Sequence, residues 1–193
     1  MPANKADLSA RLTATNPGDS ALGLFFTTVF NLVEQKAGAA ALRTLRVGEL
    51  ARDYSEIRMY PARDFLQLLY SAADQLELQL GSPDAVFRAC GEMSINRYNS
   101  GPGRFLFGVI ARGDPHKLFS AAQLGYSAAV TYGRREYKAT SFKSGVLRSQ
   151  GDVMPPSFHE GVLTGSLKLL KIEGRARGRA QGIDRVEYDI TWN

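Results

Sequence analysis

The sequence predicts an α+β domain: an N-terminal helical half packed on a C-terminal four-stranded antiparallel sheet of β-β-α-β-β order. Up to Gly125, apolar residues recur every three or four positions, which is typical of helices. From Tyr126 to Trp192 they alternate with polar residues, as in strands that bury one face. One helical segment interrupts that alternation. A sheet with one apolar face needs a cover, which the upstream helices can supply.

Length and composition indicate a single folded unit. The chain has 193 residues, 44% of them hydrophobic and 10% aromatic, which are ordinary values for a globular domain. The turn sequence Asn-Pro-Gly-Asp at positions 16–19 separates a polar start from the first apolar run. We therefore expect residues 1–19 to form a flexible leader, or a short first helix, and residues 20–193 to form a single α+β domain.

Charge and apolar runs exclude several classes of protein. No run reaches the roughly 20 apolar residues of a membrane span, and the N-terminus lacks an apolar signal core. We therefore expect a cytoplasmic protein without a membrane span. The net charge is +5, with 11 Lys and Arg against 7 Asp and Glu after Gly133. This excess is modest for a nucleic-acid binder, so we expect no nucleic-acid partner.

The helical half is divided by caps and breakers. The run Ala21 to Glu34 carries a wide apolar stripe, and Pro61 to Leu80 is the strongest helical pattern in the chain. Gly81 ends that helix, and Ser82-Pro83-Asp84 begins a second one that continues to about Tyr98. Phe105 to Ile110 is expected to be a short apolar helix.

A cap followed by proline occurs a second time in this half. Asp114-Pro115 opens a helix that runs through Phe119 and Ala122. The single cysteine, Cys90, excludes an internal disulfide and a cysteine-based zinc site. Because its neighbours Val86 and Phe87 are apolar, we expect a buried hydrophobic side chain rather than a reactive thiol.

Four strands are expected in the last third of the chain. Residues 128–133 and 137–142 alternate, and Gly133 can supply the positive φ of a turn between them. Residues 143–154 are ambiguous, with a crossing strand at Gly145 to Ser149 as one interpretation. Residues 172–180 and 185–192 form the last two strands, joined by a turn at 181–184.

The helix between the strand pairs begins near Ser157, which has capping-box spacing to Glu160. Gly161 and Gly165 follow, although each glycine costs a helix about 1 kcal/mol relative to alanine. We expect both to lie close to the sheet or to a ligand, facing the small residues of the next strand, Gly174, Ala176 and Gly178.

The same strand carries Arg175, Arg177 and Arg179 on its opposite face. A solvated basic row is the favoured interpretation, and bidentate binding of phosphate or carboxylate is the alternative.

No catalytic arrangement is recognisable. The two histidines, His116 and His159, each fall in the first turn of an expected helix. No nucleophile motif of the Gly-x-Ser-x-Gly type and no ligand-spaced metal cluster accompanies them. We therefore expect no enzyme, no catalytic residue and no metal.

Five segments are together typical of one family: Tyr60-Pro61-x-x-Asp64-x-Leu66-x-Leu68-Leu69-Tyr70-x-Ala72-Ala73, Gly113-Asp114-Pro115, Tyr132-Gly133-x-Arg135, Glu160-Gly161-Val162-Leu163 and Tyr188-Asp189-Ile190-x-Trp192. The chain resembles a large paralogous family of uncharacterised proteins in myxobacteria, over roughly residues 20–192. The role of that family is unknown.

The element order is also similar to a wider group that contains haem nitric-oxide sensor domains, vinyl-reductase-type ligand-binding domains and subunits of the TRAPP tethering complex. That similarity implies a helical cap over an antiparallel sheet with an apolar cavity between them. Haem sensors pair a helical histidine with a downstream Tyr-x-Ser-x-Arg motif. Neither Tyr126 to Val130 nor Tyr132 to Glu136 matches it after His116, so we expect no haem and no other cofactor.

These observations favour a non-enzymatic ligand-binding or sensory module with an apolar pocket between the Pro61 to Leu80 and Ser157 to Leu170 helices and the sheet. Its ligand would be small, and apolar or acidic. The alternative is a protein-interaction module that forms a homodimer or docks a partner protein. The candidate ligand-binding residues are Phe26, Leu69 and Phe158 as lining, Gly161 and Gly165 as space, and Arg135 or Arg175 near an acidic head group.

Overall fold

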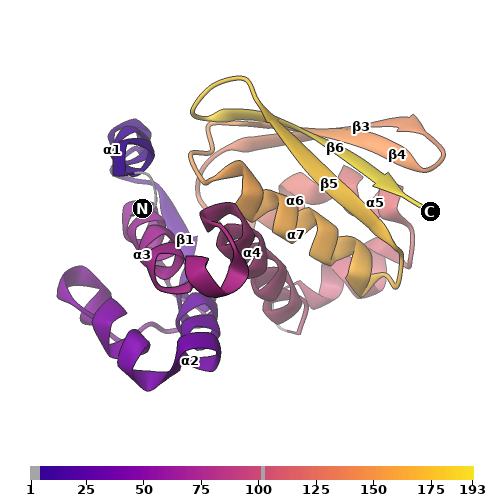
Figure 1. Cartoon of the computed structure of the whole chain (residues 1–193). Coiled ribbons are helices and arrows are strands. Elements are labelled where there is room, and N and C mark those ends of the chain that lie inside the picture. The colour runs from indigo at the N-terminus through magenta and orange to yellow at the C-terminus, as the bar shows by residue number, and fades with distance from the viewer. Residues whose placement is uncertain (1–4, 101–102) are drawn as a thin grey trace.

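The computed structural model describes residues 5–100 and 103–193, and it has the α+β architecture that the sequence predicts (Figure 1). The four-stranded sheet is antiparallel throughout, in the order β3-β4-β6-β5. Its strands are β3 (Arg134–Ser141), β4 (Ser144–Gln150), β5 (Gly174–Ala180) and β6 (Arg185–Trp192). A small second sheet pairs β1 (Ser20–Leu22) with β2 (Met59–Pro61).

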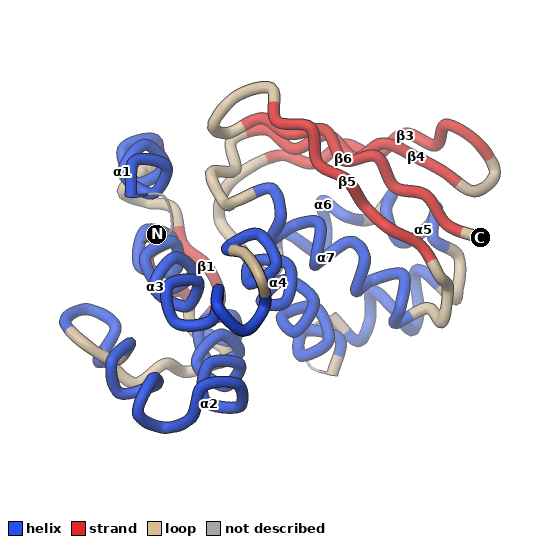
Figure 2. The backbone as a smooth tube through the Cα atoms, viewed as in Figure 1, coloured by secondary structure: helices blue, strands red, loops and turns tan. Residues whose placement is uncertain are grey.

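Helices cover one face of the larger sheet, and further helices pack behind them (Figure 2). The helix α7 connects the two strand pairs and lies beneath β5 and β6, with α4 beside it (Figure 1). The helices are α1 (Lys5–Ala14), α2 (Gly23–Leu45), α3 (Ala62–Leu80), α4 (Pro83–Asn99), α5 (Pro115–Ser120), α6 (Ala122–Ser127), α7 (Pro156–Leu169), the 3₁₀ helix η1 (Gly48–Ala51) and the π-helix η2 (Leu106–Ala111).

The predicted helix boundaries in the first half are confirmed at their caps. Gly81 ends α3 with a positive φ of 92°, and the Ser82 hydroxyl accepts a hydrogen bond from the amide of Ala85 at the start of α4. The Asp114 carboxylate accepts from the amides of His116 and Lys117 and begins α5.

Of the two structures expected for the start of the chain, a flexible leader or a short helix, the chain forms the short helix. Residues 5–14 form the helix α1, and Arg11 donates hydrogen bonds to the carbonyls of Val153 (2.9 Å) and Met154 (3.3 Å). The helix is therefore tied to the loop between β4 and α7, at the far end of the sequence.

The predicted first strand, residues 128–133, is wrong. The chain there is helical through Ser127 and then forms a turn and a bend, with an isolated bridge between Val130 and Ala21. Val130 and Tyr132 are buried while Thr131 between them is exposed, so an irregular connection can resemble a strand in its apolar pattern. The ambiguous stretch after residue 143 supplies the missing strand, β4.

The predicted hairpin turn at Gly133 is wrong for the same reason. Gly133 does have a positive φ, 74°, but it precedes β3 instead of linking two strands. The hairpin between β3 and β4 turns at Phe142 and Lys143.

The predicted capping box of the last helix is also wrong, because both side chains make tertiary contacts. α7 begins at Pro156, with Pro155 in the capping position. The Ser157 hydroxyl donates to the Asp84 carboxylate at the start of α4 (2.8 Å), and the Glu160 carboxylate accepts from the Gly178 amide of β5 (2.8 Å).

The glycines of α7 face α4 and not β5, which corrects the predicted arrangement. A Cβ atom on Gly161 would lie 2.0 Å from the carbonyl oxygen of Arg88, and one on Gly91 would lie 2.0 Å from that of Phe158. Gly165 faces Glu92 and Ile95 of α4. Glycine lets the two helix backbones touch, because no side chain separates them.

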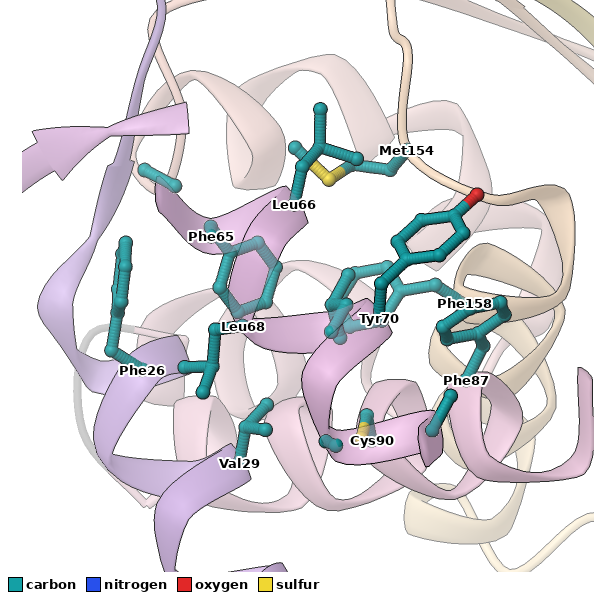
Figure 3. Close-up of a cluster of buried hydrophobic side chains, with 14 of the residues drawn as sticks. Phe26, Val29, Phe65, Leu66, Leu68, Tyr70, Phe87, Cys90, Met154 and Phe158 are labelled. Carbon is teal, nitrogen blue, oxygen red and sulfur yellow. The ribbon is translucent and has the colours of Figure 1, made fainter. Parts of the chain in front are cut away.

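The largest apolar cluster lies where α2, α3, α4 and the start of α7 meet (Figure 3). Phe26, Phe65 and Phe158 contact one another in series, with ring centroids 5.1 and 5.6 Å apart. Cys90 is fully buried in this cluster, as predicted, and burial raises the pKa of its thiol to about 12. The thiol is therefore protonated at neutral pH and unreactive.

Replacing Gly161 with alanine is expected to destabilise the domain, because the new methyl group would overlap a backbone carbonyl of α4 that has no rotamer to change. We expect Gly161→Ala to lower the free energy of unfolding by about 1–3 kcal/mol in urea titrations. Gly108→Ala is the matched control, since a Cβ there meets no atom within 4 Å. Equal stability of the two variants would contradict the backbone contact.

Candidate functional site

An apolar cavity of about 80 Å³ lies on the inner side of α4 and α7. Aromatic and aliphatic side chains form most of its wall, and most of these residues are buried. They come from α2, α3, α4, η2, α5, α6, α7 and the irregular segment before β3. The lining residues are Phe25, Phe65, Ser94, Ile95, Tyr98, Leu106, Phe107, Leu118, Phe119, Ala122, Gly125, Tyr126, Ala129, Val130, Tyr132, Phe158, His159, Val162, Leu163 and Ser166.

Most polar atoms in the wall are bonded within the protein. The Tyr98 hydroxyl donates to the carbonyl of Gly125 (3.1 Å), and the Ser166 hydroxyl donates to that of Val162 (2.8 Å). The Ser94 hydroxyl is different: it is buried and makes no hydrogen bond within the part of the chain that the structure describes. An unpaired buried hydroxyl is unfavourable unless a guest molecule or water satisfies it.

A network of ionisable side chains borders this cavity on the side of the sheet. Asp152, in the loop between β4 and α7, is ion-paired with Arg135 of β3, and their side chains are 2% and 1% exposed. His159 of α7 places Nε2 2.9 Å from the same carboxylate. Its Nδ1 shares a hydrogen bond of 3.0 Å with the Tyr126 hydroxyl. Three segments distant in sequence are thus joined by one carboxylate.

The network also fixes the electrostatics of the site. Burial alone would raise the pKa of Asp152, but His159 and the Arg135 guanidinium outweigh it and hold the pKa well below its usual value. The carboxylate therefore stays ionised and the buried guanidinium stays paired. Arg135 also donates to the carbonyl of Tyr132 (2.7 Å) and lies over the Tyr126 ring, 4.0 Å from its centroid.

The structure brings only one of the predicted ligand-binding residues to the cavity. Phe158 lines it, whereas Phe26 and Leu69 lie in the apolar cluster of α2, α3 and α4. Gly161 and Gly165 contact α4. These four residues contribute to packing around the cavity.

The two predicted arginines lie apart from each other. Arg135 is buried and paired with Asp152, so its charge is already neutralised. Arg175 is exposed on the outer face of the sheet together with Arg177 and Arg179, which agrees with the favoured interpretation of a solvated basic row. Neither arginine lines the cavity.

Sequence patterns did not indicate the residues that border the cavity on its polar side. The sequence places His159 in the first turn of a helix and gives no sign of its burial, whereas in the structure its side chain is 6% exposed. Asp152 lies in an irregular loop, and Tyr126 lies where the helical pattern fades. The only signal was an ionisable residue next to an apolar one, Phe158-His159, at the start of a helix.

Comparison with known proteins identifies the family. Residues 14–193 match the model of a family described as protein of unknown function (DUF2378), and the chain belongs to that family. No curated protein sequence matches it.

Solved structures that resemble the chain are H-NOX proteins. The Fe(II) unliganded H-NOX protein of K. algicida has a TM-score of 0.71 and 16% sequence identity, with 89% of this chain and 96% of that chain covered. An Fe(II) H-NOX mutant of S. oneidensis gives the same TM-score, identity and coverages. At this level of identity the likeness shows a shared fold.

The residues around the cavity do not fit a haem, the group named with another of the similar H-NOX structures. A volume of about 80 Å³ is well below the roughly 300–1,000 Å³ of ordinary ligand pockets, and a porphyrin lies within that larger range. Both ring nitrogens of His116 are engaged, with the Tyr137 hydroxyl (2.8 Å) and the carbonyl of Phe142 (3.0 Å). His159 is held between Tyr126 and Asp152, so neither histidine offers a free nitrogen to iron.

Within residues 5–100 and 103–193, no three His, Cys, Asp or Glu side chains come together as metal ligands. The helices in the same ranges are all too short or too polar to cross a membrane.

Removing the Asp152 charge is expected to destabilise the domain strongly, because the Arg135 guanidinium would remain buried without a counter-ion. We expect Asp152→Asn to lower the free energy of unfolding at pH 7 by about 3–5 kcal/mol. The control is Asp189→Asn, which removes an exposed ion pair with Arg179 that is worth at most about 1 kcal/mol.

The pH dependence of stability provides a second readout. Because the folded pKa of Asp152 lies below its unfolded value of about 3.9, its contribution is present above that value and is lost as pH falls towards the folded pKa. Wild-type stability should fall across this acidic window, and the Asp152→Asn protein should show a smaller slope. An unchanged slope would contradict the role of the ion pair.

Proposed function

We propose that this chain is a non-enzymatic sensory module that binds a small apolar molecule directly, without haem. The observation that carries the proposal is the apolar cavity between α4, α7, η2 and the α5–α6 pair, with the unpaired Ser94 hydroxyl in its wall. A domain of this size normally fills its core to crystal-like density, and space of this volume lined by apolar groups favours apolar guests.

The polar groups beside the cavity support binding rather than catalysis. Asp152, Arg135 and His159 contact one another, and the Tyr126 hydroxyl is bonded to His159. A general acid or base must reach the reacting atom of a substrate, and these groups reach one another instead. Their arrangement is suited to holding α6, α7 and β3 around a guest.

Xenon is a suitable first probe, because it is apolar and small enough for the cavity. We expect dissolved xenon to shift the methyl resonances of Leu118 and Leu163, which line the cavity, by filling empty space. Ala122→Leu should abolish the shifts by filling the same space. Ala128→Leu, an exposed position nearby, is the matched control and should leave the shifts unchanged.

Hemin provides the contrasting arm of this experiment. We expect no stoichiometric Soret band when hemin is added to the purified protein. Absence of any xenon-dependent shift in the wild-type protein would contradict direct binding, and a histidine-ligated haem spectrum would contradict the haem-free part of the proposal.

A second candidate function is homodimerisation through β3, because the two edges of the sheet differ. At the β5 edge the amides of Ala176 and Gly178 are occupied by the side chains of Thr164 (3.2 Å) and Glu160 (2.8 Å) of α7. At the β3 edge, residues 138–141 are exposed and the hairpin ends in Phe142, which is 86% exposed. Open edges of this kind pair readily with another strand.

Sedimentation equilibrium at micromolar concentration tests this candidate. Ala139→Pro removes a donor from the exposed part of β3 and is expected to shift a dimer to monomer. Ala180→Pro, at the end of the β5 edge, is the control. A wild-type protein that is strictly monomeric would rule the dimer out.

A further inference from the structure

A second hollow opens at the surface next to the apolar cavity. It is a groove of about 590 Å³ between the C-terminal end of α4, η2 and the residues that follow α7. Its floor is apolar and its rim is polar and basic, which gives it two chemical zones. The lining residues are Asn99, Ser100, Arg104, Phe107, Gly108, Gly113, Leu169, Leu170 and Lys171.

Phe107 lines both hollows, so its side chain separates the groove from the buried cavity. It is only 8% exposed and belongs to η2, whose π-helical geometry is uncommon and is often found at functional positions. The next residue, Gly108, has open space at its Cβ position. Directly after η2, the backbone has positive φ angles at Arg112 and Gly113. Phe107 is thus the side chain through which a guest could pass from the groove to the cavity.

The groove carries two cations with no counter-ion. Arg104 and Lys171 are exposed, and neither takes part in an ion pair among residues 5–100 and 103–193. By contrast, the neighbouring Lys168 is paired with Glu92 at 2.7 Å. The C-terminal end of α7 lies at the same groove, and its carbonyl groups carry a partial negative charge that repels an anion. Both cations are therefore needed to attract an anion to the groove.

We propose that the ligand of this domain is a short-chain carboxylate that enters past Phe107, with its carboxylate at Arg104 and Lys171 and its aliphatic tail in the apolar cavity. This inference rests on the proposed function, because it names the ligand class of the same cavity. The wall of the cavity is apolar and does not favour a charged group, whereas the groove that shares Phe107 with it has both apolar and basic lining residues.

The volume limits the length of the tail. About 80 Å³ is roughly half of an apolar cavity of about 150 Å³ that holds benzene, so a tail of roughly three methylene or methyl groups fits beyond Phe107. Butyrate has this length. A much longer chain would have to displace core side chains, which native packing resists.

The test compares butyrate with its uncharged analogue 1-butanol and with the longer octanoate, on the full chain. Binding is followed by the methyl resonances of Leu118 and Leu163 and by titration calorimetry. We expect butyrate to shift both resonances, 1-butanol to bind more weakly, and octanoate not to reach the cavity.

Two sets of variants separate the head group from the entry path. Arg104→Ala with Lys171→Ala should weaken butyrate about fivefold and leave 1-butanol unchanged, since surface charge contacts are modest. Lys138→Ala with Arg175→Ala removes the same charge from the sheet and is the matched control, with no expected change. Phe107→Trp should slow the entry of butyrate, because the larger side chain stands between the groove and the cavity. A cooperative thermal unfolding transition verifies that the Phe107→Trp protein is folded.

The outcomes are distinguishable. Equal butyrate affinity in the Arg104/Lys171 variant and in the wild type would overturn the head-group assignment. Xenon shifts without any butyrate shift would overturn this inference and leave the proposed function standing. Absence of both shifts would overturn the proposed function as well.

Discussion

The contact between the backbones of α4 and α7 is the constraint on which the rest of the domain depends. A Cβ atom added to Gly91 or to Gly161 would lie 2.0 Å from a carbonyl oxygen of the other helix. Helices normally pack with axes 8–10 Å apart because side chains separate them, and glycine removes that spacer. The pair is also tied at its rim by Ser157 to Asp84 and by Lys168 to Glu92.

This contact decides where empty space remains. With α4 and α7 held together, the apolar side chains of η2, α5 and α6 must complete the wall on the remaining side, and a cavity of about 80 Å³ is left between them. The Asp152 network holds the opposite wall, because it links β3 and the β4–α7 loop to α7. A buried ion pair of this kind adds little net stability, but it is costly to break, and so it fixes the arrangement of the segments that it joins.

The shared fold and the local chemistry lead to different conclusions about the ligand. The likeness to H-NOX proteins extends over most of the chain, at 16% identity for the two solved structures given above. In this chain, however, both histidines have partners at each ring nitrogen, and the space at the centre is small. Function resides in the site and not in the fold, and a cavity of this size supports the proposal of a guest of a few atoms.

The sequence by itself determined the local elements and their class. Apolar spacing and caps such as Ser82, Gly81 and Asp114 located α3, α4 and α5, and the alternation in residues 185–192 located β6, because these signals act between residues close in sequence. The wrong predictions arose where a local pattern had a nonlocal cause: Val130 and Tyr132 alternate with Thr131 although they lie in an irregular connection, and Ser157 bonds to Asp84 instead of capping its helix.

Only the tertiary structure decided the site. The sequence indicated that Gly161 lies close to a neighbour but not that the neighbour is α4, since glycine carries no side chain to specify a partner. Arg135, Asp152 and His159 are 17 and 7 residues apart in turn, and no periodicity relates a strand, a loop and a helix. Their contact, and the cavity beside it, follow from how the elements pack.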